Sequence, residues 1–251
     1  MLRVEKVSKE RFLPSGERVR VLDGIDLEAA SARITAVIGP SGGGKSTLLR
    51  LINRLEEADA GRIEVEGTDI RACDPLELRR RVVMVLQSPF MYPGTVLDNL
   101  QHPFLLQGRV PPSGESSEVR KCLELCSLGM DLLPNRAGTL SVGQQQRLCL
   151  ARVLLLAPRV LLLDEPTSAL DRPTADHLAE TLRRICRQEG VTILVVAHDL
   201  RLVKRCADVV AYLEKGRILE YGPCAELLSA PRTDSLRRFL AEPDEQGDEV
   251  P

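Results

Sequence analysis

A glycine-rich stretch from Gly39 to Thr47 is the part of this chain with the clearest potential for chemistry. It reads Gly-Pro-Ser-Gly-Gly-Gly-Lys-Ser-Thr, with an apolar run at 34–38 before it and a helix-like run at 48–55 after it. A strand that turns through glycines into a helix presents backbone N–H groups and the positive end of the helix dipole to an anion. The spacing therefore predicts a loop that binds phosphate groups.

Each residue type in the loop suits one part of that task. Gly42, Gly43 and Gly44 let the backbone wrap around phosphates without clashes of a Cβ atom. Lys45 can reach the β and γ phosphates of ATP, and the hydroxyl of Ser46 can ligate Mg²⁺. The alternative is an ordinary glycine-rich turn, but strand, turn, Lys-Ser-Thr and helix in register favour the phosphate loop.

Three further polar residues each follow directly on an apolar run. Gln87 comes after 82–86, Asp164 after 160–163, and His198 after 191–197. Because ligands of parallel sheets bind at the carboxyl ends of the strands, we predict that these residues and the phosphate loop meet at one edge of a sheet.

The chemistry predicted at that edge is ATP hydrolysis. Asp164 would hold Mg²⁺ opposite Ser46, and Glu165 would take a proton from the attacking water. Gln87 would orient water or complete the metal shell, and His198 would donate to the γ-phosphate. A lone Gln or His at a strand end is more often structural, but the phosphate loop and the paired acids favour catalysis.

Phe12 has two open interpretations. Its aromatic ring could stack on the adenine of ATP, or it could cap the core of a hairpin.

These residues require an α/β fold of the P-loop NTPase type. We predict a mostly parallel sheet flanked by helices, an N-terminal antiparallel β-subdomain and a helical insertion subdomain. The predicted helices are 48–55, 96–106, 115–128, 143–156, 174–188 and 199–206. The predicted parallel strands are 34–38, 82–86, 160–164 and 191–197. The predicted antiparallel strands include 61–67 and a closing hairpin at 209–213 and 217–221.

The predicted domain organisation follows the same pattern. The ranges are 1–86 for the β-subdomain and first part of the ATPase core, 87–157 for the loop after Gln87 and the helical subdomain, 158–222 for the second part of the core, and 223–251 for C-terminal helices and an acidic tail. We expect the tail at 242–251 to be disordered.

Composition excludes several classes of protein. Of 251 residues 43% are hydrophobic and 28% charged, and the net charge of −2 indicates no surface for nucleic acid. The seven cysteines form no CxxC pair, which argues against a disulfide framework or a zinc site and fits a reducing cytoplasm. Cys122 and Cys126 are expected to be buried apolar groups. No apolar run approaches the ~20 residues that span a bilayer, and the first residues lack the apolar core of a signal peptide.

The region after residue 139 carries a specific resemblance. Leu140-Ser-Val-Gly-Gln144, the following Gln-Gln-Arg147, and Val160-Leu-Leu-Leu-Asp-Glu-Pro-Thr-Ser-Ala-Leu-Asp171 resemble the signature helix, Walker B strand and D-loop of ABC-transporter ATPase subunits. Phosphate loop, Gln87, signature, Walker B, Asp171 and His198 occur in that family's order, and the resemblance extends to about Leu240.

The resemblance implies that ATP lies between the phosphate loop of one subunit and the signature of a second. Ser141, Gly143 and Gln144 would then bind ATP across a homodimer, together with Asp171. The family pattern has Gly where this chain has Val142, which adds bulk and disfavours positive φ. This departure bears on the geometry of the signature and on turnover rate.

The predicted site residues are the following. Those for ATP are Phe12, Gly39, Pro40, Ser41, Gly42, Gly43, Gly44, Lys45, Ser46, Thr47, Ser141, Gly143, Gln144 and Asp171; those for the metal are Ser46, Gln87 and Asp164; the catalytic residues are Glu165, His198 and Gln87.

The same resemblance implies work at the cytoplasmic face of a membrane with integral permease subunits and, in an importer, a solute-binding protein. The segment 88–93, with Phe90, Met91 and Tyr92, would receive a helix of the permease, and a local core turn is the alternative. The runs IGPSGGGKSTLLRLINRL, ELRRRVVMVLQSP, GTVLDNL and LEYGP resemble subunits for uptake of phosphate and related oxyanions. Residues 98–107 resemble a small family of metal exporters.

Other classes of protein fit less well. ABC-type ATPases of DNA repair carry long coiled coils and those of translation carry two cassettes, whereas some fifty proline-rich residues separate Gln87 from Ser141 here. A phosphate-loop kinase has no use for a signature helix. A binding module without hydrolysis would be favoured only if Val142 proves disabling.

Overall fold

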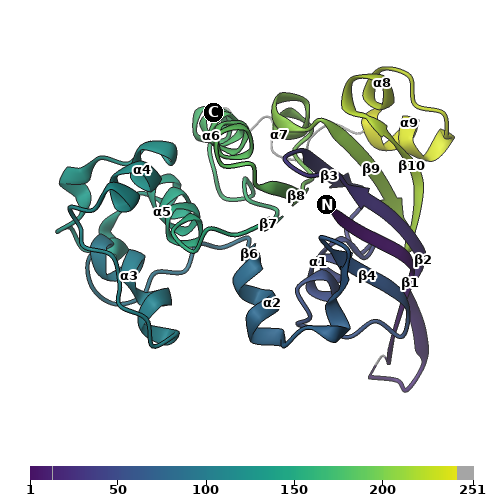
Figure 1. Cartoon of the computed structure of the whole chain (residues 1–251). Coiled ribbons are helices and arrows are strands. Elements are labelled where there is room, and N and C mark those ends of the chain that lie inside the picture. Colours follow the sequence, from purple (N-terminus) through teal and green to yellow (C-terminus); the bar gives the residue numbers. More distant parts are fainter. Residues whose placement is uncertain (13, 242–251) are drawn as a thin grey trace.

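The computed structural model of the chain describes residues 1–12 and 14–241. These residues form a six-stranded sheet and a four-stranded sheet with helices packed around them (Figure 1). The acidic tail predicted to be disordered lies outside the described residues. No helix among residues 1–12 and 14–241 combines the length and the apolar character needed to cross a bilayer.

The six-stranded sheet positions the predicted strand-end residues. Its order is β10-β9-β3-β8-β7-β6. β3 pairs in parallel with β8 and β9, and β7 pairs in parallel with β6 and β8. The bounds are β3 Ile34–Ile38, β6 Val82–Val85, β7 Val160–Asp164, β8 Thr192–Val196, β9 Val209–Glu214 and β10 Arg217–Pro223. The four predicted parallel strands are therefore confirmed.

Every residue of β3, β7 and β8 is buried, which explains their continuous apolar sequence. Successive side chains point to opposite faces of the sheet. Leu161 and Leu163 join a core cluster with the helices between residues 96 and 241, whereas Leu162 joins a second cluster with the helix Lys45–Ile52 and the antiparallel sheet. The parallel sheet thus separates two hydrophobic cores.

The antiparallel sheet has the order β2-β1-β4-β5 and comprises β1 Leu2–Phe12, β2 Arg18–Ala29, β4 Ala60–Val65 and β5 Thr68–Asp69. Alternating residues such as Leu2, Val4, Ile63 and Val65 are buried, in agreement with the predicted half-exposed strands. The hairpin of β9 and β10 is also present. However, β9 additionally pairs in parallel with β3, so it lies inside the sheet next to the edge strand β10, a position that the hairpin pattern did not indicate.

The described helices fall into two groups. Around the sheets lie α1 Lys45–Ile52, α2 Pro75–Arg81, α6 Arg172–Glu189, α7 Leu200–Cys206, α8 Cys224–Ser229 and α9 Asp234–Ala241, and the helical region consists of α3 Val96–Leu106, α4 Ser117–Leu125 and α5 Val142–Leu154 with short 3₁₀ turns. Figure 1 shows α3, α4 and α5 on one side of the molecule and β1, β2 and β4 on the opposite side.

Local capping explains the boundaries of α4 and α6 that differ from prediction, whereas α1 spans Lys45–Ile52 instead of the predicted 48–55 and has no side-chain cap. α4 is shorter than the expected 115–128 because Ser116 caps its start and Ser127, with φ of 53°, follows its end. α6 begins earlier than residue 174 because Asp171 caps it and Pro173 occupies its first turn. α3 matches the predicted helix at both ends.

Candidate active site

The phosphate loop joins β3 to α1, and two of its glycines are required by the surrounding backbone. Gly39 has φ of 145°, and a Cβ atom there would collide with the carbonyl of Leu213. Gly44 has φ of 104°, and a Cβ atom there would lie 2.6 Å from a methyl carbon of Leu22 in β2. The loop is therefore held between the parallel sheet and the antiparallel sheet.

Lys45, the first residue of α1, is buried inside the loop. Its Nζ donates to the carbonyl oxygens of Gly39 at 2.8 Å and Pro40 at 2.9 Å. Burial lowers the pKa of Lys45, and the nearby carboxylates of Glu165 and Asp164 act in the opposite direction. The start of α1 has no side-chain cap. A buried ammonium beside uncapped helix N–H groups suits a phosphate ligand.

Ser46 and Asp164 bring together oxygen donors from α1 and β7. The hydroxyl of Ser46 donates to Oδ1 of Asp164 at 2.9 Å. Burial raises the pKa of Asp164, which the Ser46 hydrogen bond partly offsets. Hydroxyl and carboxylate oxygens are donors that Mg²⁺ accepts, usually with phosphate oxygens and waters completing its shell. Within residues 1–12 and 14–241, no group of three or more His, Cys, Asp or Glu side chains could hold a metal ion.

Glu165 lies between Gln87 and His198. Its Oε2 accepts from Nε2 of Gln87 at 3.4 Å, and its Oε1 lies 2.7 Å from Nε2 of His198. The backbone of Glu165 has φ of 46°, and its N–H donates to the carbonyl of Val196 at 2.9 Å. Non-glycine residues with positive φ are uncommon and concentrate at functional sites. The carboxyl ends of β6, β7 and β8 thus deliver three polar groups to one place.

The region that resembles a signature forms a separate helix start. Ser141 caps α5 by accepting from the N–H of Gln144, whose side chain accepts from the N–H of Ser141. Val142 is the first residue of α5 and its side chain is 46% exposed. Val142 is not among the residues with positive φ, so its backbone avoids the conformation that valine disfavours. A bulky side chain is nevertheless presented at the start of the helix.

Gly143 has a structural role that the sequence pattern did not reveal. A Cβ atom at this position would lie 2.5 Å from Cγ2 of Thr174 in α6. The same threonine donates its N–H to the cap of α6, Asp171, at 3.3 Å. The starts of α5 and α6 are therefore adjacent. Among the hydrogen bonds of the described residues, none joins Ser141, Gln144 or Asp171 to the phosphate loop.

Phe12 lies at the end of β1 and is 70% exposed. The guanidinium of Arg18 lies 5.3 Å from the centre of its ring. A side chain this exposed does not cap a hairpin core, so that interpretation is wrong. Stacking on adenine stays a prediction.

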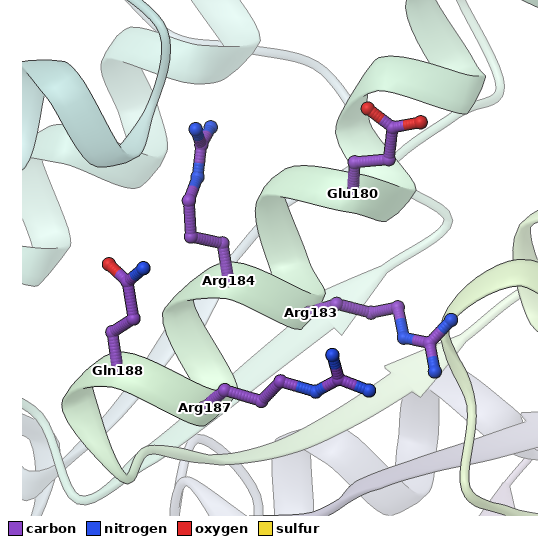
Figure 2. Close-up of a pocket in the computed structure, with 5 residues that line it drawn as sticks. All are labelled: Glu180, Arg183, Arg184, Arg187 and Gln188. Carbon is purple, nitrogen blue, oxygen red and sulfur yellow. The ribbon is translucent and has the colours of Figure 1, made fainter.

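An open hollow of about 330 Å³ lies on the outer face of α6, away from this chemistry. Figure 2 shows its lining: Glu180, Arg183, Arg184, Arg187 and Gln188. Arg183 donates to the carbonyl of Arg205, and Arg184 donates to the carbonyl of Leu125 and the hydroxyl of Ser127. These arginines hold neighbouring segments together, and none of the lining residues belongs to the phosphate loop or the strand-end group.

A phosphate loop between a parallel strand and a helix, with an acidic pair on the neighbouring buried strand, defines an ATPase of the P-loop class. The family model described as "ABC transporter" matches residues 22–168, which is more than half of the chain. The chain belongs to the ABC transporter family, and the resemblance noted in the sequence is confirmed.

Two curated relatives illustrate the similarity. "Protein STAR1" of Oryza sativa subsp. japonica is 43% identical over 220 residues, 88% of this chain and 62% of that protein. "Methionine import ATP-binding protein MetN" of Pasteurella multocida (strain Pm70) is 37% identical over 244 residues, 96% of this chain and 70% of that protein. The chain therefore spans about two thirds of the length of these relatives.

A solved structure supports the fold and the activity. It is described as "Dimeric structure of a post-hydrolysis state of the ATP-binding cassette MJ0796 bound to ADP and Pi". It superposes with a TM-score of 0.76 and 28% sequence identity, covering 89% of this chain and 99% of that chain. The predicted P-loop NTPase fold is confirmed, and the chain is an ATPase of the ABC family.

Proposed function

We propose that this chain is the ATP-hydrolysing subunit of a membrane importer, acting as a homodimer that closes on two ATP molecules. The observation that carries the proposal is the placement of Glu165 between Gln87 and His198, next to the Ser46–Asp164 pair. In-line attack of water on a γ-phosphoryl group needs a base, a bound metal and donors for the developing charge. We assign the base, the metal ligands and the donors to side chains at one edge of the six-stranded sheet.

In the proposed reaction each of these side chains has a stated role. Glu165 takes a proton from water as the water oxygen bonds to the γ-phosphorus, and the bond from that phosphorus to the β–γ bridging oxygen breaks. Lys45 and His198 donate to the γ-phosphate oxygens, and Gln87 holds the water. Mg²⁺, held by Ser46 and Asp164 with help from Gln87, would neutralise charge on the phosphates. The products are ADP and inorganic phosphate.

The dimer is proposed from the exposed start of α5. Ser141 and the N–H of Gly143 form a helix N-terminus, which attracts anions. Among the hydrogen bonds of the described residues, none joins this helix start to the phosphate loop of the same chain. The γ-phosphate held by Lys45 of one copy would meet Ser141, Gly143 and Gln144 of the other, with Phe12 on the adenine and Asp171 at the junction. The dimeric structural relative supports this arrangement.

A separate permease is proposed as the partner that receives the motion, with this chain at the cytoplasmic face of the membrane. Phe90 in the segment after Gln87 is 61% exposed, and Leu86 is 56% exposed. Met91 packs against the hydrophobic core, so the segment is partly a core turn and partly free surface. Exposed apolar side chains on a structured turn suit a helix of a permease subunit.

The cargo proposal changes in the light of the relatives. The phosphate or oxyanion cargo expected from short runs of sequence is not supported, whereas a relative at 37% identity is named for methionine import. We therefore propose import of a small organic solute of the amino-acid type, with a solute-binding protein as a further partner. ATP turnover of the complex in liposomes, measured with methionine and with phosphate at the outer face, distinguishes the two classes of cargo.

The variant Glu165→Gln tests the catalytic assignment. We expect it to bind ATP, to lose hydrolysis by about 10²–10⁴-fold, and to accumulate as an ATP-bound dimer on gel filtration. Glu180→Gln, an exposed change on the outer face of α6, is the control that should behave as the parent. Hydrolysis by Glu165→Gln at the parent rate would show that another group is the base.

A further inference from the structure

A buried asparagine clamps the segment that follows Gln87. Asn99 of α3 has no exposed surface. Its Oδ1 accepts from the N–H of Tyr92 at 2.9 Å, and its Nδ2 donates to the carbonyls of Tyr92 at 3.0 Å and Thr95 at 2.9 Å. A primary amide has both the acceptor and the donors that this pairing requires. Asn99 therefore holds both the N–H and the carbonyl group of Tyr92.

The helix α5, which is capped by Ser141, also holds this segment. Arg152 of α5 donates through Nη1 to Oδ1 of Asn99 at 3.3 Å, and its guanidinium lies 5.1 Å from the centre of the Tyr92 ring. Through Nη2 it also donates to Sγ of Cys149 at 3.4 Å. The thiol of Cys149 in turn donates to the carbonyl of Phe90 at 3.8 Å. α5 therefore contacts the segment at Phe90 and at Tyr92.

These contacts lie between Gln87 and the start of α5, which are two parts of the proposed ATP site, and they include no residue of either part. The clamped segment begins directly after Gln87, whose amide reaches Glu165. The clamping helix α5 is capped by Ser141, which is proposed to bind the ATP of the partner copy. A displacement of Gln87 on nucleotide binding would reach α5 through Tyr92, Asn99 and Arg152, because close-packed groups transmit displacement.

We propose that Asn99 and Arg152 are positioning residues that lock the segment 88–93 to α5, so that both shift as one unit when nucleotide binds. The proposal rests on the proposed function, since it assumes that Gln87 senses ATP. Its alternative is that the cluster contributes stability alone. The two differ in whether the exposed side chain of Phe90 still responds to nucleotide once the clamp is broken.

The chain provides a direct reporter for this test. It contains no tryptophan, so Phe90→Trp introduces a single tryptophan at an exposed position, and tryptophan emission can be excited apart from that of the three tyrosines. Acrylamide quenching of its emission is measured with and without the non-hydrolysable β,γ-imido analogue of ATP and Mg²⁺, and the affinity for the analogue is measured by equilibrium dialysis. Quenching is expected to change on binding. The clamp variants Arg152→Met, Arg152→Lys and Asn99→Asp are then combined with the reporter.

We expect the clamp variants to lose the nucleotide-dependent change in quenching while the dissociation constant of the analogue stays within about tenfold. Arg109→Met is the matched control, because the guanidinium of Arg109 lies 5.0 Å from the ring of Phe104 in the same helical region without contacting the segment. If Asn99→Asp fails to fold, the Arg152 variants carry the test.

Two results would overturn the proposal. One is a parent-like quenching response in folded clamp variants, even if their Tm is lower, because the cluster would then be structural only. The other is a reporter that binds the analogue without any change in quenching. Failure of the analogue to bind the parent chain at all would instead refute the proposed function, and with it the assumption about Gln87.

Discussion

Asp164 and Glu165 are adjacent in sequence but occupy different surroundings. Asp164 is the last residue of β7, buried against Ser46 and Lys45, whereas Glu165 leaves the strand with φ of 46° toward Gln87 and His198. One carboxylate is desolvated and lies beside a hydroxyl, and the other lies within hydrogen-bonding distance of the side chains of Gln87 and His198. This difference supports a metal-holding role for the first and a base for the second.

The buried carboxylate carries a cost in the absence of nucleotide. Burial raises the pKa of Asp164 because it disfavours the charged carboxylate. The folded chain therefore has its full stability from this group below the ordinary aspartate pKa, and it loses that stability as pH rises through the raised pKa of the folded state. We expect Asp164→Asn to raise the free energy of unfolding of the nucleotide-free chain by about 1 kcal/mol at neutral pH, with a gain that shrinks on acidification. Urea unfolding at several pH values measures this.

The same variant should lose ATP hydrolysis by about 10²-fold or more, because a metal-holding oxygen is replaced by an uncharged amide. Asp131→Asn in the helical region is the control for the removal of one negative charge. A loss of stability in Asp164→Asn at neutral pH would contradict the interpretation that desolvation outweighs the hydrogen bond from Ser46.

At the scale of elements, one close approach that depends on a glycine lies between the starts of α5 and α6. Gly143 leaves room for Cγ2 of Thr174, at 2.5 Å from where a Cβ atom would be. Asp171 and Ser141 cap the two helices at this point. The signature glycine therefore supports helix packing as well as the proposed contact with ATP.

We expect Gly143→Ala to lower the free energy of unfolding by about 1–2 kcal/mol through this clash. Thr174→Ser removes only the clashing methyl group and keeps the N–H that Asp171 accepts. The double variant should recover most of the loss, a non-additivity that urea unfolding of the four proteins would measure. Additive effects would mean that Thr174 is not what restricts position 143.

At the scale of the whole molecule, nucleotide should act as a ligand of the folded state and as a bridge between copies. At 100 times its dissociation constant, Mg²⁺-ATP should add about 2.7 kcal/mol to the stability of Glu165→Gln, a rise in Tm of roughly 5–11 °C for a chain of this size. Because binding is shared in a dimer, the rise should also grow with protein concentration. Differential scanning fluorimetry at several concentrations measures both effects.

ADP and the variant Lys45→Ala are the controls for this prediction. ADP lacks the γ-phosphate that would bridge the copies, so its effect should not depend on protein concentration. Lys45→Ala removes the buried ammonium and should abolish the rise in Tm caused by ATP. A concentration-independent rise with ATP would mean that each site is complete within one copy.

Much of the fold was predictable because it depends on local patterns. Continuous apolar runs predicted β3, β6, β7 and β8, and capping residues with helical periodicity predicted α3 within its observed bounds. The place of β9 between β10 and β3 was not predictable, because pairing with β3 is a contact between distant segments that a hairpin pattern does not encode.

The sequence by itself determined the phosphate loop, the acidic pair and the family, because glycine freedom, strand burial and residue order are written in consecutive residues. Only the tertiary structure decided that Glu165 lies between Gln87 and His198, that Phe12 is exposed, and that Asn99 and Arg152 clamp the segment after Gln87. These contacts join residues far apart in the chain, and their geometry is set by how sheet and helices pack.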